Sequence, residues 1–128
     1  MSREMRRPKS LKAKEPPRFC PRFHHAVELI GRRWSGAILH AMLPGAQCFN
    51  EFLATVPGLS DRLLTERLRE LEAEGLVRRN VLPGPPVRVS YEMTEAGEDL
   101  EPVIRALGKW ADRWVTIKTD KTDQRGCP

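Results

Sequence analysis

The residues with the clearest chemical potential lie in one segment, LSDRLLTERLRELEAEGLVRRNV, at positions 59–81. At about 100° per residue, Leu64, Leu68 and Leu71 fall within about 60° on one side of a predicted helix. The outward side then carries Arg62, Thr65, Glu66 and Arg69, with Ser60 just before the helix. Arginine can bind a guanine edge, threonine can touch a thymine methyl group, and a carboxylate can accept a hydrogen bond from cytosine. This side therefore has the chemistry to read DNA bases.

A simpler interpretation also fits these side chains. Arg62 and Glu66 are four residues apart, and Glu66 and Arg69 are three apart, which are the spacings of ion pairs on an ordinary solvated helix. Charge on this helix alone favours that interpretation. The interpretation as a DNA-binding helix gains support from the next segment, which supplies Arg78, Arg79 and Arg88. Backbone phosphates are usually held by neighbouring basic residues of this kind.

The elements that must position these residues follow from apolar periodicity. We expect helices over residues 22–33, 34–43, 49–56, 61–74 and 94–118, and strands over residues 76–82 and 87–93. A proline-rich turn, PGPP, joins the strands into a hairpin with a stiff tip, because each proline ring fixes a backbone dihedral.

Capping residues and helix breakers set the expected boundaries. Pro21 suits the first helical position and puts Cys20 at the N-cap. The other expected caps are Ser35, Ser60 and Thr94. Gly75 should end the fourth helix, and Pro102 should kink or break the last one near its start.

The order of elements predicts a mainly α fold with a small β-hairpin. The third and fourth helices are joined by PGLS at residues 57–60, as in a helix-turn-helix. In that motif the second helix lies in the major groove of DNA. A hairpin directly after it makes a winged helix-turn-helix.

Several ordered motifs resemble those of a known family. They are CP at 20–21, LIGRRWSGAIL at 29–39, FNEF at 49–52, PGLSDRLLTERLRELEAEGLVRR at 57–79, PGPPVRVSYEMTEAG at 83–97 and LGKW at 107–110. Across about residues 20–114 the sequence resembles the HxlR-type transcriptional regulators, a bacterial winged-helix group related to the MarR-like repressors. The resemblance implies a homodimer that binds operator DNA, with the first and last helices in the dimer interface.

The apolar stripe of the last helix supports such an interface. It runs from Leu100 to Val115 and contains two tryptophans, more than one helix of so small a domain would easily bury, and aromatic residues are common at interfaces. The expected interface residues are Phe23, Val27, Ile104, Leu107, Trp110 and Trp114. The alternative is that both tryptophans belong to the core. A two-fold dimer would place its reading helices about 34 Å apart, or a multiple of that, and so would bind an inverted repeat.

The three cysteines argue against a secreted, disulfide-built domain. Several members of the family sense oxidants or electrophiles through a cysteine just before the first helix, and Cys20 matches that position. A helix N-terminus and the flanking Arg18 and Arg22 favour its thiolate, and oxidation could bridge subunits or engage a resolving thiol. Cys48 stands where the family usually has a basic residue and is a candidate second thiol, whereas Cys127 should be inert. A purely structural role for Cys20 stays open, as does control by a small ligand near the dimer interface.

Other chemistries find little support. Cys20, His24 and His25 share one helical turn, but structural zinc normally needs four ligands, so we expect neither a metal site nor a cofactor. The chain has no phosphate-cradling glycine loop, no nucleophile motif and no recognisable carboxylate pair, so we do not expect an enzyme.

The charge of the 128-residue chain is unevenly placed. Residues 1–18 hold seven basic and two acidic side chains, which gives +5, and residues 19–128 hold fifteen of each sign. We expect a disordered basic arm at residues 1–19, a winged-helix domain at 20–118 and a disordered polar tail at 119–128. Because the domain itself is neutral, a winged-helix module that contacts only proteins remains an alternative. Without a secretory signal or a run of about 18 apolar residues, we expect a cytoplasmic protein.

Overall fold

The computed structural model describes residues 15–45 and 47–117. The elements are α2 (Pro21–Gly31), α3 (Ser35–Ala41), β1 (Gln47–Cys48), α4 (Phe49–Thr55), α5 (Asp61–Ala73), β2 (Val77–Leu82), β3 (Arg88–Met93), α6 (Glu95–Glu98) and α7 (Glu101–Trp114). This order confirms the predicted winged helix-turn-helix, with α4 and α5 as the motif and β2–β3 as the wing. Most of the expected basic arm and all of the expected tail after residue 118 lie outside the described ranges.

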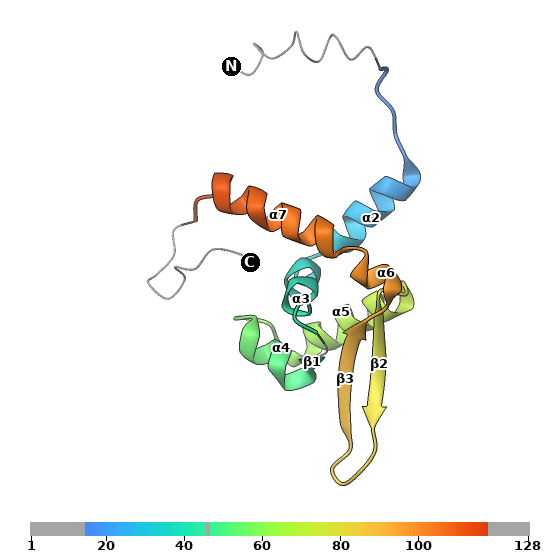
Figure 1. Cartoon of the computed structure of the whole chain (residues 1–128), viewed down its shortest axis with the longest axis vertical. Helices are drawn as coiled ribbons and strands as arrows, with labels where there is room; N and C mark the ends of the chain where they lie inside the picture. The colour runs from blue at the N-terminus through green and yellow to red at the C-terminus, as the bar shows by residue number, and fades with distance from the viewer. Residues whose placement is uncertain (1–14, 46, 118–128) are drawn as a thin grey trace.

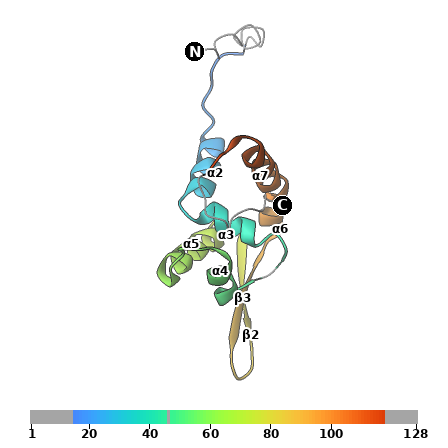
Figure 2. The same cartoon turned by 90° about the vertical axis from the view of Figure 1, so that its left-hand side faces the viewer.

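The elements are arranged along one long axis. The β2–β3 hairpin projects from one end of the molecule, and α2 and α7 lie at the opposite end (Figures 1 and 2). The helices α3, α4 and α5 lie between these two ends. No helix in the described ranges is long and apolar enough to span a lipid bilayer.

The core is built around α5. Leu64, Leu68 and Leu71 are all at most 1% exposed, which confirms the predicted apolar side of this helix. They pack with the buried side chains that other elements contribute, including Ile38, Leu39, Phe52 and Val77. The α5 helix is therefore held by α3, α4 and the first strand of the wing.

The junction between α2 and α3 differs from the prediction. Ser35 is not the cap of α3; it is buried inside the first turn, and Trp34 occupies the N-cap position without a capping side-chain hydrogen bond. Trp34 has a left-handed backbone with φ of 78°, a conformation that costs a non-glycine residue about 1–3 kcal/mol. Its ring lies against Gly58 in the α4–α5 turn, where an added Cβ would sit 3.3 Å from the ring. Packing of the indole against this turn, rather than local capping, thus decides where α3 begins.

The sheet contains a strand that the sequence did not reveal. β1 pairs with β3 in antiparallel register, Gln47 opposite Tyr91 and Cys48 opposite Ser90, so the strand order is β1-β3-β2. We had expected only a helix break at this position. A strand of two residues is too short to show the alternation on which strand prediction depends.

The last predicted helix is divided in two, as Pro102 suggested. α6 ends at Glu98, and Pro102 lies in the first turn of α7, where its missing N–H group has no cost. Thr94 caps α6 as expected, since its Oγ1 accepts a hydrogen bond from Gly97 N at 3.2 Å. The predicted end at residue 118 was too late, because α7 stops at Trp114.

Replacing Gly97 with alanine should destabilise the fold. Gly97 is buried, and an added Cβ would collide with the carbonyl oxygen of Leu76 and lie 3.1 Å from Cβ of Met93. Because a backbone atom cannot move aside cheaply, we expect the free energy of unfolding to fall by about 1–3 kcal/mol, measured by chemical denaturation. Gly31→Ala is the matched control, since nothing lies within 4 Å of its added Cβ. Equal stability of the two variants would contradict this account of α6 packing.

Candidate nucleic-acid interface

The N-terminus of α5 is fixed by its predicted cap. Ser60 has an extended backbone, and its Oγ accepts a hydrogen bond from Leu63 N at 3.1 Å. The hydroxyl thereby satisfies one of the free N–H groups of the first turn. The cap sets where the exposed side of α5 begins.

The outward side of α5 carries side chains that are free or weakly held. Arg62 is 85% exposed, and its Nε lies 3.3 Å from Oε2 of Glu66. An exposed pair of this kind contributes about 0.3–0.5 kcal/mol, so Arg62 can exchange it for a stronger partner. Thr65 donates its hydroxyl to the carbonyl oxygen of Asp61 at 2.9 Å.

The simpler interpretation of these charges is only half correct. The Arg62–Glu66 pair exists, but Glu66 does not pair with Arg69. Its second partner is Arg67, whose Nη1 lies 3.7 Å from Glu66 Oε1. Arg69 is consequently left without an ion pair to any residue in the described part of the chain.

Arg67 is the residue that the sequence analysis missed. It is 8% exposed and donates from Nε to the main-chain oxygen of Arg33 at 2.8 Å, which connects α5 to the α2–α3 junction. A signal for this placement was present, because Arg67 falls about 60° from Leu64 on the helical wheel and therefore on the core side.

A groove of about 350 Å³ separates α5 from the wing strands. Its lining residues are Thr65, Leu68, Arg69, Glu72, Arg79 and Tyr91. Arg79 of β2 pairs with Tyr91 of β3, and its side chain lies on the face of the hairpin that is directed toward α5. Within residues 15–45 and 47–117 neither Arg69 nor Arg79 forms an ion pair. The structure thus brings two arginines without ion pairs to one groove, which they share with a single carboxylate, Glu72.

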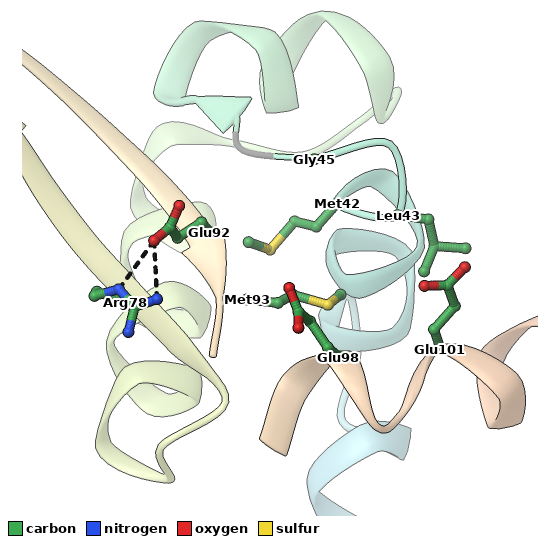
Figure 3. A pocket seen from close by; sticks show the side chains of 8 residues that line it. All are labelled: Met42, Leu43, Gly45, Arg78, Glu92, Met93, Glu98 and Glu101. Carbon is green, nitrogen blue, oxygen red and sulfur yellow. Dashed lines mark hydrogen bonds and ion pairs between the residues drawn. The ribbon is translucent and has the colours of Figure 1, made fainter. Parts of the chain in front are cut away.

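Arg78 lies on the opposite face of the wing. Its Nη2 and Nε contact Oε2 of Glu92 at 2.9 and 3.0 Å, and these hydrogen bonds, with a further one from Asn80, hold the pKa of the Glu92 carboxyl below its usual value. The pair lies in a pocket of about 340 Å³ beside Glu98 and Glu101 (Figure 3). Arg78 thus has a carboxylate partner within the protein, and its contact with the DNA backbone stays a prediction.

The three wing arginines do not all flank the tip. Arg88 begins β3 opposite Leu82, directly after the turn, and is exposed. Arg78 and Arg79 instead lie near the start of β2, next to α5. The tip between the strands also exposes the apolar side chains of Val81, Leu82 and Val87.

The expected interface residues divide into two groups. Phe23, Val27, Leu107, Trp110 and Trp114 are each at least half exposed, so the two tryptophans are not part of the core. Ile104 was placed in the interface by the sequence analysis, but it is 8% exposed and packs in the core. The apolar stripe of α7 is wide enough to contact the core along one edge and to be exposed along the other. Ile104 faces the core, and the larger apolar side chains of the helix remain exposed.

The two described cysteines are free thiols in different environments. Cys20 is exposed at the N-cap of α2, and Cys48 is partly buried in β1. Arg18 has its own partner, Glu15, at 3.6 Å. Cys127 lies outside the described residues. His24 and His25 pair with Glu28 and Glu74, and no group of three or more potential metal-ligating side chains occurs in the described ranges.

Known proteins share this architecture and sequence. The family model described as HxlR-like helix-turn-helix matches residues 29–119. The uncharacterized HTH-type transcriptional regulator YvaP of Bacillus subtilis is 46% identical over 96 residues, which cover 75% of this chain and 89% of the relative.

Two solved structures extend the comparison. The reduced form of the transcriptional regulator YodB from B. subtilis matches with a TM-score of 0.69 and 39% identity, over 80% of this chain and all of that chain. The redox regulator HypR in its oxidized form matches with a TM-score of 0.72 and 37% identity, over 77% of this chain and all of that chain. YodB has also been solved after diamide treatment and with quinone bound.

These relatives are regulators of transcription, which does not favour a module limited to protein contacts. The family model covers well over half of the chain, and the sequence match to YvaP is extensive. The chain belongs to the HxlR-like helix-turn-helix family of transcriptional regulators.

Proposed function

We propose that this regulator binds an inverted-repeat operator as a homodimer, with α5 of each subunit in the major groove. The observation that carries the proposal is the division of α5 into a leucine side, which is fully buried, and a side with Arg62 and Arg69, which is exposed. A helix anchored in this way can enter a groove without disturbing the core, since none of the outward side chains holds the fold together.

The outward residues fall into two roles. Arg62, Thr65 and Glu66 lie on the exposed side of α5 and have the hydrogen-bonding and methyl groups that distinguish base pairs. Arg69 and Arg79 converge on the groove beside the wing, where positive charge suits a backbone phosphate. Arg88, next to the wing tip, suits the adjacent backbone or minor groove. Ser60 approaches the DNA at the start of the helix.

The dimer is supported by the uncovered apolar surface of α2 and α7. Large exposed apolar patches usually mark interaction sites, and these two helices expose Phe23, Val27, Val103, Leu107, Trp110 and Trp114. They lie at the end of the molecule opposite the wing tip (Figures 1 and 2). Pairing of two copies through this end would leave both copies of α5 free for DNA.

Thiol chemistry at Cys20 is the proposed means of control. Cys20 is exposed on the helix that belongs to the proposed dimer surface, so a change at its sulfur acts where the subunits meet. Two thiols that lose two electrons and two protons to an oxidant form a disulfide, and the partner is either the second copy of Cys20 or Cys48. The Cys20 thiolate could instead add to a ring carbon of a quinone, which forms a C–S bond and, after protonation, leaves the ring as a hydroquinone thioether. The forms in which YodB and HypR have been solved make both reactions worth testing here.

The first test concerns DNA reading. Wild-type protein is used to select a duplex from a random library, and affinities for that duplex and for a shuffled one are measured by mobility shift. Arg62→Ala should lower the preference for the selected duplex by about 5–150-fold, the range for loss of one good base contact. Arg69→Ala should weaken binding to both duplexes and reduce the slope of log affinity against log salt by about one.

Lys109→Ala, which removes an exposed charge from α7, is the control for both arginine variants. Unchanged binding by both arginine variants would refute the assigned reading side.

A second test concerns the dimer. Wild-type protein should sediment at about twice the chain mass of 14.6 kDa. Trp110→Asp should give monomers, because a carboxylate would be buried without a partner in the interface. Lys109→Asp changes the neighbouring exposed position on another side of α7 and should keep the dimer. Monomeric wild-type protein, or a Trp110→Asp dimer, would show that the subunits pair elsewhere or not at all.

The third test concerns the thiols. Diamide should reduce affinity for the selected duplex at least about tenfold, with recovery after dithiothreitol, and Cys20→Ser should abolish the response. Non-reducing electrophoresis of Cys48→Ser, with Cys127→Ser in the same protein, then separates the two disulfides: a remaining dimer band indicates a Cys20–Cys20 bridge, and its loss indicates a bridge through Cys48. A Cys20→Ser protein that still responds fully would exclude Cys20 as the sensor.

A further inference from the structure

The buried guanidinium of Arg67 is unusual in a helix whose other arginines are exposed. At 8% exposure it has lost most of its hydration, which is costly unless protein groups replace the water. Arginine has five N–H donors in a planar fork and can meet several acceptors at once. The partners of Arg67 therefore show what its burial achieves.

Three acceptors surround this side chain. Its Nε donates to the main-chain oxygen of Arg33 at 2.8 Å, and its Nη1 lies 3.4 Å from Glu70 Oε2 and 3.7 Å from Glu66 Oε1. The first contact reaches another element, the α2–α3 junction. The other two hold carboxylates of α5 itself.

Each of these carboxylates has a second partner. Glu66 pairs through Oε2 with Arg62, on the outward side of α5. Glu70 pairs through Oε1 with Arg32, the residue that ends α2, at 3.1 Å. The result is a continuous chain of charges, Arg32–Glu70–Arg67–Glu66–Arg62, which runs from the end of α2 to the exposed surface of the reading helix.

We propose that Arg67 is a positioning residue for base recognition. From inside the domain it holds Glu66, and through Glu66 it limits where Arg62 can lie, while its bond to Arg33 fixes α5 relative to α2. This inference rests on the proposed role of α5 in DNA reading. Arg67 touches no base in this account; its effect on sequence preference is transmitted through Glu66 and Arg62.

The replacement must separate positioning from simple destabilisation. Arg67→Ala would leave a cavity and is unsuitable. Arg67→Met fills a similar volume with an apolar chain and leaves no large cavity, but it removes the donor to the main-chain oxygen of Arg33 and should lower the free energy of unfolding. Both carboxylates keep their other partner, Arg62 for Glu66 and Arg32 for Glu70, so neither is left unpaired.

The experiment compares the selected duplex with the shuffled duplex at low salt, for Arg67→Met, Arg62→Ala and the double variant. We expect Arg67→Met to reduce the affinity ratio at least about tenfold while affinity for the shuffled duplex stays within about twofold. Arg62→Ala should then have much less effect in the Arg67→Met protein than in wild type, because residues that act through one another are not additive. Arg67→Lys, which keeps the charge but not the fork, should restore the ratio only in part.

The control is an arginine outside the Arg67 network. Arg105→Met removes an arginine that pairs with Glu101 at 2.7 Å within α7 and should leave the ratio unchanged. If Arg67→Met does not fold, Glu70→Gln weakens the same network at a partly exposed position and should lower the ratio in the same direction. If Arg67→Met lowers the affinity for both duplexes equally, and the effect of Arg62→Ala is fully additive to it, then Arg67 has only a structural role. Failure of wild-type protein to select any duplex would instead overturn the proposed function, and this inference with it.

Discussion

The burial of one side of α5 is the constraint on which the rest of the structure depends. Complete burial of a leucine side chain contributes about 1.5–3 kcal/mol, whereas an exposed ion pair such as Arg62–Glu66 contributes about 0.3–0.5 kcal/mol. Leu64, Leu68 and Leu71 therefore decide how the helix is rotated, and the charged side chains follow. The charged surface of α5 is in this sense a consequence of core packing.

The arginines near this surface differ in what already holds them. Arg67 and Arg78 are held by acceptors of the protein, Arg67 within the core and Arg78 by Glu92 on the far face of the wing. Arg69, Arg79 and Arg88 lack such partners among the described residues and keep their charge available. Similar residue types in one short stretch thus divide into paired and unpaired groups, within the described residues, according to the acceptors that the fold places near them.

The opposite end of the molecule has a different character. There α2 and α7 expose aromatic and aliphatic side chains to water. Such exposure is thermodynamically unfavourable for a monomer. The charge network through Arg67 connects the end of α2 with α5, so the apolar end and the exposed side of α5 are parts of one packed body.

Periodicity and turn chemistry were sufficient to predict the order of the helices and of the two wing strands, the caps at Ser60 and Thr94, the break near Pro102 and the leucine side of α5. These features are local, so a few neighbouring residues determine them. Tertiary structure decided what depends on distant partners. Trp34 displaced Ser35 as the cap because its ring packs on Gly58, and β1 exists only because β3 lies beside it. Ile104 is in the core while Trp110 is outside, and Arg67 is buried while Arg69 is exposed, because burial depends on which elements approach each side of a helix. A sequence specifies which residues share a side, but only packing determines what covers that side.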